Sequence, residues 1–240
     1  MKYMGSKNRI AKFLLPIILE NRKQNQWYVE PFVGGANMID KVSGNTMGSD
    51  LNKYIISMWK GLQMGVERPN EIPKELYNRA RIEYNNGTEN EFTKFMIGWI
   101  GWMGSFNGRF FDGGYSGKTK TRDYVNEQIR NTEKQIGNIL NVCFYHSSYD
   151  ELPIPPNSII YCDIPYKGTK QYSISKDFDY NKFWEWCRKM TKNGHTVFIS
   201  EYNAPEDFKC VWEMEVTNSM HTTKTKKPIE KLFTYVNNEN

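Results

Sequence analysis

The segment Tyr161–Tyr166, which reads Tyr-Cys-Asp-Ile-Pro-Tyr, carries residue types suited to chemistry on an exocyclic amino group. The amino nitrogen of adenine is a poor nucleophile because its lone pair is delocalised into the ring, so catalysis needs acceptors for both amino hydrogens. Asp163 and the backbone carbonyl of Ile164 can supply them, while Tyr166 stacks on a base rotated out of a duplex. Pro165 fixes the turn. The alternative is an ordinary turn in which Asp163 is a capping residue.

A glycine-containing turn and a later acidic residue indicate a nucleoside cofactor. Glu30–Asn37 places Gly34 and Gly35 where a strand passes into a helix, so that a ligand can approach the backbone closely. Asp50 ends the next expected strand, where a carboxylate can hydrogen-bond a ribose hydroxyl. A plain tight turn and a helix N-cap at Asp50 are the alternatives. These residues do not separate a nicotinamide cofactor from S-adenosylmethionine, whereas the segment Tyr161–Tyr166 favours S-adenosylmethionine.

Apolar periodicity places these residues on an alternating series of strands and helices. Short apolar runs predict strands, and apolar spacing of three and four residues predicts amphipathic helices. The alternation predicts an α/β fold with a doubly wound, Rossmann-like parallel sheet, in which ligands bind beyond the carboxyl ends of the strands. The expected strands are 27–33, 46–49, 142–145, 158–162 and 196–200, and the expected helices are 8–19, 36–42, one from 52 onward, 92–103, 123–140 and 183–194.

The alternation of strands and helices is interrupted over residues 61–138. Within them, two aromatic stretches separated by turn residues at 105–115 indicate a hairpin or an ordered loop. Thr88 and Glu91 match a capping box for the helix at 92–103. We therefore expect two parts, a core of residues 1–60 and 139–240 and a mainly helical insertion of residues 61–138.

Composition bounds the compartment and the partners. The four cysteines lack C-x-x-C spacing and the three histidines sit at no metal-ligand interval, so we expect a reducing compartment and no metal. The apolar run 13–19 lacks a signal cleavage site and is too short to span a bilayer, so we expect no membrane association and a cytoplasmic location. A net charge of +5 permits a polyanionic partner, and 15% aromatic residues suit base stacking as well as core packing.

Taken together, these motifs resemble the Dam-type (D12 class) family of S-adenosylmethionine-dependent DNA adenine-N6 methyltransferases, along nearly the whole chain and in the family's motif order. Asp163–Tyr166 is similar to the family's Asp-Pro-Pro-Tyr, Glu30–Ala36 to its Glu-Pro-Phe-x-Gly-x-Gly loop, and Asp50–Asn52 to its Asp-x-Asn. Lys2–Lys7 looks like the amino-terminal motif. Residues 227–233 look loosely like the carboxyl-terminal segment that contains a glutamate.

The resemblance implies S-adenosylmethionine as the cofactor and double-stranded DNA as the partner. It also implies a bacterial or phage-infected host, and it leaves open a functional pairing with a restriction endonuclease. The implied catalytic residues are Asp163, Ile164, Pro165 and Tyr166. The implied cofactor-binding residues are Tyr3, Lys7, Glu30, Phe32, Gly34, Gly35, Asp50 and Asp163.

The insertion corresponds to the family's target-recognition region, and residues 105–115 are distantly like its hairpin. Asn107 and Arg109 can read base edges, because Arg pairs well with guanine and Asn with adenine. A phosphate contact or a structural turn is the alternative for both. Residues that suit phosphate binding, or else form a solvated charged face, are Lys118, Lys120 and Arg122.

The chain departs from the family pattern at Ile164, which replaces the first proline of the motif, and at Ala36, which replaces the last glycine of the loop. Any residue offers a backbone carbonyl, and Pro165 keeps Ile164 extended, so we expect activity to be retained. The alternative from another class is a DNA-binding module that has lost catalysis. Methylation of RNA, protein or a free nucleotide is a third hypothesis, which the insertion argues against, and a nicotinamide dehydrogenase is the least favoured.

Overall fold

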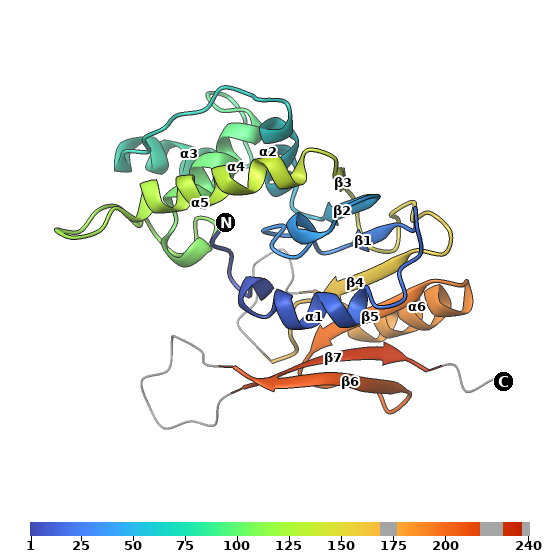
Figure 1. Ribbon diagram of the computed structural model, residues 1–240. Coiled ribbons are helices and arrows are strands. Elements are labelled where there is room, and N and C mark those ends of the chain that lie inside the picture. The colour runs from blue at the N-terminus through green and yellow to red at the C-terminus, as the bar shows by residue number, and fades with distance from the viewer. Residues whose placement is uncertain (169–176, 217–227, 237–240) are drawn as a thin grey trace.

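The computed structural model describes residues 1–168, 177–216 and 228–236, which are organised around one seven-stranded sheet (Figure 1). The strand order is β3-β2-β1-β4-β5-β7-β6. Neighbours from β3 to β5 pair in parallel, whereas β7 pairs antiparallel with both β5 and β6. The strands are β1 (Tyr28–Glu30), β2 (Thr46–Asp50), β3 (Cys143–His146), β4 (Ile159–Asp163), β5 (Thr196–Glu201), β6 (Phe208–Glu215) and β7 (Ile229–Tyr235).

The expected α/β sheet is confirmed, and all five expected strands are present in it. The two antiparallel strands were not predicted. β6 is an edge strand in which Phe208 is the one buried residue, so its sequence carries little apolar pattern. β7 begins inside the segment 227–233 that resembles the family's carboxyl-terminal segment, and it extends to Tyr235. Lys227 of that segment falls outside the described residues.

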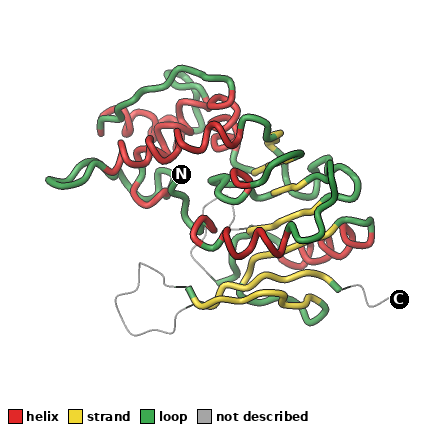
Figure 2. Tube along the Cα trace, in the orientation of Figure 1, coloured by secondary structure: helices red, strands yellow, loops and turns green. Residues whose placement is uncertain are grey.

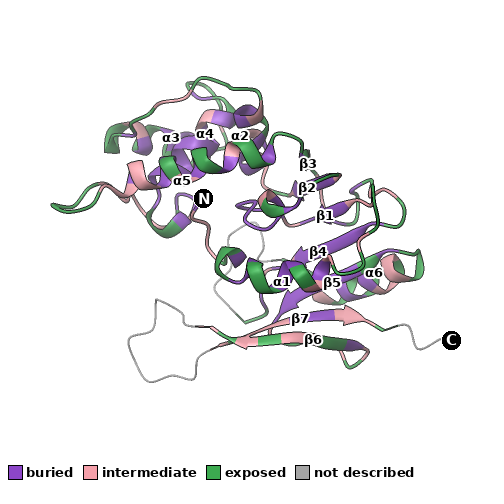
Figure 3. Cartoon of the chain, viewed as in Figure 1, coloured by how far each residue is buried: buried purple, intermediate pink, exposed green. Residues whose placement is uncertain are grey.

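Side chains from the two faces of the sheet enter two separate apolar cores. In β4, Tyr161 joins the core that contains α1 (Ala11–Ile18), while Ile160 and Cys162 join the core that contains α6 (Tyr180–Lys192). Figure 1 shows these two helices on opposite sides of the sheet, and Figure 3 shows β4 buried between them. Because both faces are covered, the strand is apolar along most of its length.

The chain after β1 does not form the helix expected at 36–42, and that prediction is wrong. Only a 3₁₀ turn, η2 (Ile39–Lys41), is present there. Gly34 and Ala36 have φ angles of +42° and +52°, so the backbone turns too tightly to begin an α-helix. The helix expected at 8–19 is likewise divided into a 3₁₀ turn, η1 (Lys7–Arg9), and α1.

Four helices connect β2 to β3 and form a layer beside the sheet (Figure 2). Gly98 allows two of them to meet closely, because a Cβ at this position would lie 2.4 Å from the backbone oxygen of Tyr54. The helices are α2 (Lys53–Gln63), α3 (Lys74–Asn86), α4 (Lys94–Gly104) and α5 (Tyr124–Ile139).

The start of α4 differs from the expected capping box. Thr93 caps the helix, and its Oγ1 accepts the N–H of Met96 at 3.3 Å. Glu91 instead donates its own N–H to Glu83 Oε1 at 2.6 Å. The predicted capping box of Thr88 and Glu91 is therefore wrong, because Glu83 of α3 accepts the N–H of Glu91 and holds the chain before α4.

Residues 105–115 form an ordered loop, and the hairpin is wrong. The loop contains a 3₁₀ turn, η3 (Phe106–Gly108), and is closed by a single bridge. Phe110 and Phe111 are both buried, although side chains alternate between faces in a strand. Phe111 also has a φ of +52°, which lies outside the range of a strand.

Candidate functional site

Four neighbouring parallel strands each end in a carboxylate. Glu30, Asp50, Asp163 and Glu201 are the last residues of β1, β2, β4 and β5. Because parallel strands end at the same edge of a sheet, these residues lie along one edge, which we call the carboxylate edge. The sequence analysis identified the first three and missed Glu201. The available signal was its position directly after the strand expected at 196–200.

Lys7 connects Asp163 to the chain after β4 and to β7. Its ammonium group lies 2.9 Å from Asp163 Oδ1 and 3.9 Å from Glu230 Oε2. It also lies 4.6 Å from the centroid of the Tyr166 ring, within cation–π range. The Tyr166 hydroxyl donates to Glu230 Oε2 at 2.5 Å. We call these four residues the Lys7 cluster, and they come from widely separated parts of the chain.

The groups of the Lys7 cluster shift one another's titration. Burial lowers the pKa of Lys7, but the carboxylates of Asp163 and Glu230 outweigh burial and leave that pKa above its ordinary 10.5. Burial raises the pKa of Asp163 above its ordinary 3.8, although the Lys7 ammonium opposes the shift. Burial and then the nearby carboxylates raise the pKa of Tyr166 well above its ordinary 10.0. The phenol is therefore neutral and the ammonium charged at neutral pH.

The turn after β4 is held from two sides. Glu201 accepts the backbone N–H of Lys167 at 3.0 Å and that of Tyr202 at 2.6 Å. The hydroxyl of Tyr180, from α6, donates to the carbonyl of Pro165 at 2.8 Å. Hydrogen bonds from a strand end and from a helix thus fix the backbone that follows Asp163.

The side chain of Ile164 belongs to the apolar core. It is 3% exposed and packs in the core that contains α6. Asp163, one residue earlier, keeps its ion pair with Lys7. The isoleucine that replaces the family's proline is therefore accommodated by packing on the α6 side of the sheet.

Asp50 lies against the glycine turn. Its Oδ2 accepts the N–H of Gly34 at 3.1 Å, and its Oδ1 accepts the N–H of Asn52 at 2.8 Å. Asn52 caps α2 by accepting the N–H of Tyr54 at 2.9 Å, so the alternative of Asp50 as the helix cap is wrong. Burial raises the pKa of Asp50 despite these two N–H donors.

The ring of Tyr3 covers the glycine turn. A Cβ at Gly34 would lie 2.7 Å from Tyr3 Cε1, and a Cβ at Gly35 would lie 2.6 Å from Tyr3 Cβ. Side chains at these positions would therefore displace the ring. The structure brings Tyr3, both glycines and Asp50 together, and a glycine turn beside an aromatic ring and a carboxylate fits a nucleoside.

Two other predicted cofactor residues make contacts within the protein. Glu30 is 4% exposed and accepts the Tyr28 hydroxyl at 2.8 Å, and burial raises its pKa well above the ordinary value. The ring of Phe32 stacks on that of Tyr149, with 5.5 Å between centroids, in the α6-side core. Contact of either residue with a cofactor stays a prediction.

The predicted DNA-binding residues lie on residues 105–123, which we call the insertion loop. Lys118 Nζ pairs with Asp123 at 2.9 Å, and Arg122 Nε pairs with Glu127 at 2.6 Å. Hydrogen bonds from Arg122 and Lys2 lower the pKa of Glu127 to about 2. The basic residues that the structure leaves exposed on this loop are Lys118, Lys120 and Arg122.

The start of the insertion loop packs against the amino-terminal segment. A Cβ at Gly108 would lie 2.5 Å from the Lys2 carbonyl oxygen. Asn107 has a φ of +54°, and Arg109 donates its N–H to the Phe106 carbonyl at 3.2 Å. The loop is thus joined to the segment that supplies the ring over the glycine turn, while the base-reading roles of its side chains stay predictions.

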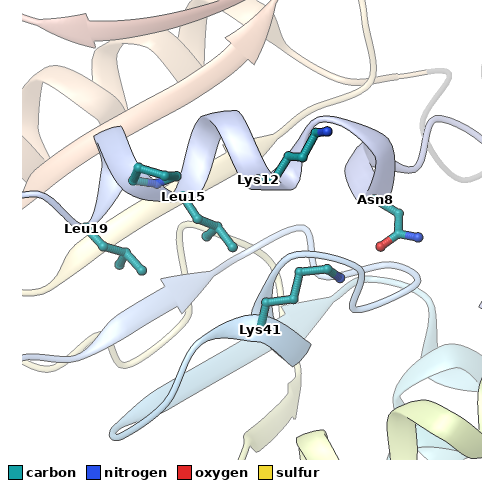
Figure 4. A pocket seen from close by; sticks show the side chains of 6 residues that line it. Asn8, Lys12, Leu15, Leu19 and Lys41 are labelled. Carbon is teal, nitrogen blue, oxygen red and sulfur yellow. The ribbon is translucent and has the colours of Figure 1, made fainter.

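Other candidate features lie away from the carboxylate edge. A groove of about 490 Å³ lies between α1 and η2 (Figure 4), and no residue of the carboxylate edge lines it. Within residues 1–168, 177–216 and 228–236, no three His, Cys, Asp or Glu side chains are grouped as metal ligands. In the same ranges no helix has the length and apolarity to cross a membrane.

Comparison with known proteins identifies a family. The family model for D12 class N6 adenine-specific DNA methyltransferases matches residues 3–230. The solved structure of SMU.472 complexed with SAH is 13% identical, covers 95% of this chain and 52% of its own, and has a TM-score of 0.42. A Listeria monocytogenes protein assigned to the class I S-adenosylmethionine-dependent methyltransferases is 10% identical, with coverages of 100% and 62% and a TM-score of 0.40. This chain thus spans 52% and 62% of the two structures, and no curated protein matches it.

Proposed function

This chain belongs to the D12 class N6 adenine-specific DNA methyltransferase family, and from that premise we propose that it methylates the N6 amino group of adenine in double-stranded DNA. One observation carries the proposal. Asp163 stands at the carboxyl end of β4, held by Lys7 at 2.9 Å, in the segment that resembles the family's catalytic motif. A carboxylate fixed at this edge is placed to accept a hydrogen bond from a substrate amino group.

The cofactor in this proposal is S-adenosylmethionine, which supplies an electrophilic methyl group when bound. Asp50 accepts the ribose hydroxyls, since each of its oxygens keeps a lone pair beyond the one used by Gly34 or Asn52. Gly34 and Gly35 form the turn at the cofactor site, and the side chain of Tyr3 lies against both of them. Lys7, Glu30 and Phe32 complete the predicted cofactor-binding set.

The target adenine is rotated out of the duplex and meets the turn after β4. Asp163 and the Ile164 carbonyl accept hydrogen bonds from the two amino N–H groups, which increases electron density on the nitrogen. Tyr166 stacks on the base. Since Tyr166 is 8% exposed in the structure, base entry requires a local movement that opens one face of its ring.

The DNA side of the site is the insertion, residues 61–138. Asn107 and Arg109 read base edges, and the exposed cations of the insertion loop bind phosphates. The packing of Gly108 on Lys2 supports this assignment, because it joins the loop to the amino-terminal segment of the site. A cytoplasmic location and a partner restriction endonuclease stay predictions from the sequence.

The test is transfer of labelled methyl groups from S-adenosylmethionine to plasmid DNA, followed by sequencing for N6-methyladenine. We expect wild-type protein to transfer label to adenine, and Asp163→Ala to lose about 10³-fold in rate, because an acceptor for the amino hydrogens is removed. Glu213→Ala removes an exposed carboxylate of β6 and serves as the control. Binding of DNA without any label transfer by the wild type would favour the non-catalytic DNA-binding alternative.

A further inference from the structure

Glu230 reaches the site because β7 runs antiparallel to β5. In this pairing Lys231 lies opposite Glu201, the last residue of β5. Glu230, one position earlier, pairs with Met214 of β6. A parallel strand in the same place would begin at the opposite edge of the sheet. The antiparallel strand thus brings one more carboxylate to the carboxylate edge.

We propose that Glu230 is a positioning residue for methyl transfer, which holds the Tyr166 ring and the Lys7 ammonium in the arrangement that Asp163 requires. The inference rests on the proposed function. Glu230 Oε2 accepts the Tyr166 hydroxyl at 2.5 Å and lies 3.9 Å from Lys7 Nζ. A hydroxyl bonded to a carboxylate makes a short, charge-assisted hydrogen bond, about twice as strong as a neutral one. One oxygen atom therefore links the ring to the ammonium.

Among the described residues, three contacts hold the Tyr166 ring. Its hydroxyl is bound by Glu230, its face receives the Lys7 ammonium at 4.6 Å, and Tyr202 packs edge-on with 4.6 Å between centroids at 82°. A stacking surface is useful only if its plane is fixed by the groups around it. The hydroxyl serves this purpose, because it already donates to Glu230 and has no second proton to donate to a base.

Glu230 also sets the charge next to Asp163. One ammonium, that of Lys7, stands between two carboxylates, so the three groups carry a net charge of −1 when ionised. Positive charge develops on the amino nitrogen as it attacks a methyl group, and a preorganised negative surrounding stabilises it. Without Glu230 the three groups would become a neutral pair, and Lys7 would draw the Asp163 carboxylate more strongly to itself.

The experiment compares Glu230→Ala, Glu230→Gln, Tyr166→Phe and the double variant Tyr166→Phe/Glu230→Ala with wild type. Glu230→Ala removes the acceptor and the charge, Glu230→Gln keeps an acceptor, and Tyr166→Phe removes only the hydroxyl. Glu213→Ala, on the exposed side of β6, is the matched control. We would measure the single-turnover rate of methyl transfer, the Kd for S-adenosylhomocysteine, and the free energy of unfolding.

We expect Glu230→Ala to slow single turnover by about 10- to 100-fold with the Kd unchanged, since small displacements of positioned groups cost up to about a hundredfold in rate. Glu230→Gln should recover part of the loss. The double variant should be no slower than Glu230→Ala alone, because both changes remove the same hydrogen bond. Wild-type rates in Glu230→Ala, or losses that multiply in the double variant, overturn the proposal. If Glu230→Ala does not fold, wild-type rates in both Glu230→Gln and Tyr166→Phe overturn it.

Failure of the proposed function is separable from failure of this inference. If wild-type protein transfers no methyl group, the proposed function is wrong. The positioning of Tyr166 is then tested by the unfolding free energies of wild type, Tyr166→Phe, Glu230→Ala and the double variant. Coupling between Tyr166→Phe and Glu230→Ala supports the inference, and additive effects overturn it.

Discussion

The Lys7 cluster and the insertion loop both concentrate charge, but they hold it in opposite ways. The Lys7 side chain is 6% exposed and stands between two carboxylates, whereas the side chains of Lys118 and Arg122 are 67% and 51% exposed. The cluster gathers residues that are far apart in sequence, while Lys118 and Arg122 each pair with a carboxylate five residues away in the chain. Buried, interlocked charge is costly to disturb, and exposed local pairs are easily exchanged for another partner.

This difference suits two tasks. A catalytic carboxylate must stay in place while the substrate changes, so it benefits from contacts made before the substrate arrives. A phosphate-binding cation must leave its protein partner when DNA arrives, and a solvated ion pair permits that exchange at little cost. The same types of charged residue therefore have different consequences when substituted in the two regions.

The largest effect is expected for Lys7→Met, which leaves Asp163 and Glu230 facing each other without their shared cation. Breaking a buried ion pair in this way costs about 3–5 kcal/mol of unfolding free energy. Urea denaturation measures it. Lys12→Met, at an exposed position of α1, should change stability little, and equal losses in both variants would remove the distinction between buried and exposed cations.

Lys7→Met should also change how the unfolding free energy and the activity depend on pH. In wild type, burial raises the pKa of Asp163 and the Lys7 ammonium partly lowers it again. Removal of Lys7 should therefore raise the pKa of Asp163 further. A carboxyl with a raised folded-state pKa favours folding below its unfolded value and loses that contribution as pH rises through the folded value. The stability of Lys7→Met should therefore fall more steeply than that of wild type as pH rises above 3.8, and the acid limb of activity should move to higher pH. An unshifted limb would show that Lys7 does not control Asp163.

A smaller effect is expected where the insertion loop is anchored. A Cβ at Gly101 of α4 would lie 2.2 Å from Phe110 Cε2, so Gly101→Ala should destabilise the fold by about 1–3 kcal/mol through overpacking. Gly137→Ala in α5 meets no atom within 4 Å and should stabilise by up to about 1 kcal/mol through helix propensity. Thermal unfolding of the pair measures both. Equal changes in the stability of the two variants would mean that Phe110 is loosely packed against α4.

The smallest effect on the fold is expected for the triple change Lys118→Gln, Lys120→Gln and Arg122→Gln. These side chains are exposed, so the melting temperature should stay close to that of wild type. DNA binding should respond instead, since three lost phosphate contacts reduce the slope of log Kd against log salt by about 2.7. Filter binding over a salt series tests this. An unchanged slope would show that these three cations do not contact DNA phosphates. The two regions would then differ only in how much their charged residues contribute to stability.

The sequence by itself determined that Asp50 and Asp163 stand at the ends of two parallel strands. Apolar runs predicted β4 and β5, and Asp50 and Asp163 were each recognised as an acidic residue at the end of an expected strand. This local pattern placed Asp50 and Asp163 correctly at one edge of the sheet. It succeeded because a strand covered on both faces leaves a continuous apolar signal that stops where the strand stops.

Local pattern failed where a contact depends on residues distant in the chain. The helix expected at 36–42 is absent because Gly34 and Ala36 take positive φ angles beside Tyr3. Of the two alternatives predicted for 105–115, a hairpin or an ordered loop, the ordered loop is present, because Phe110 and Phe111 are buried against the helical layer. In both places tertiary packing overrides the local preference.

Only the tertiary structure decided the partners of Tyr166 and Asp163. Glu230 lies 64 residues beyond Tyr166 and reaches it because β7 inserts antiparallel between β5 and β6. Lys7 reaches Asp163 from the opposite end of the chain. No periodicity or spacing encodes these meetings, because strand order and direction follow from how the whole sheet buries its two faces. The sequence therefore identified the segment Asp163–Tyr166, and tertiary contacts determined which side chains hold it.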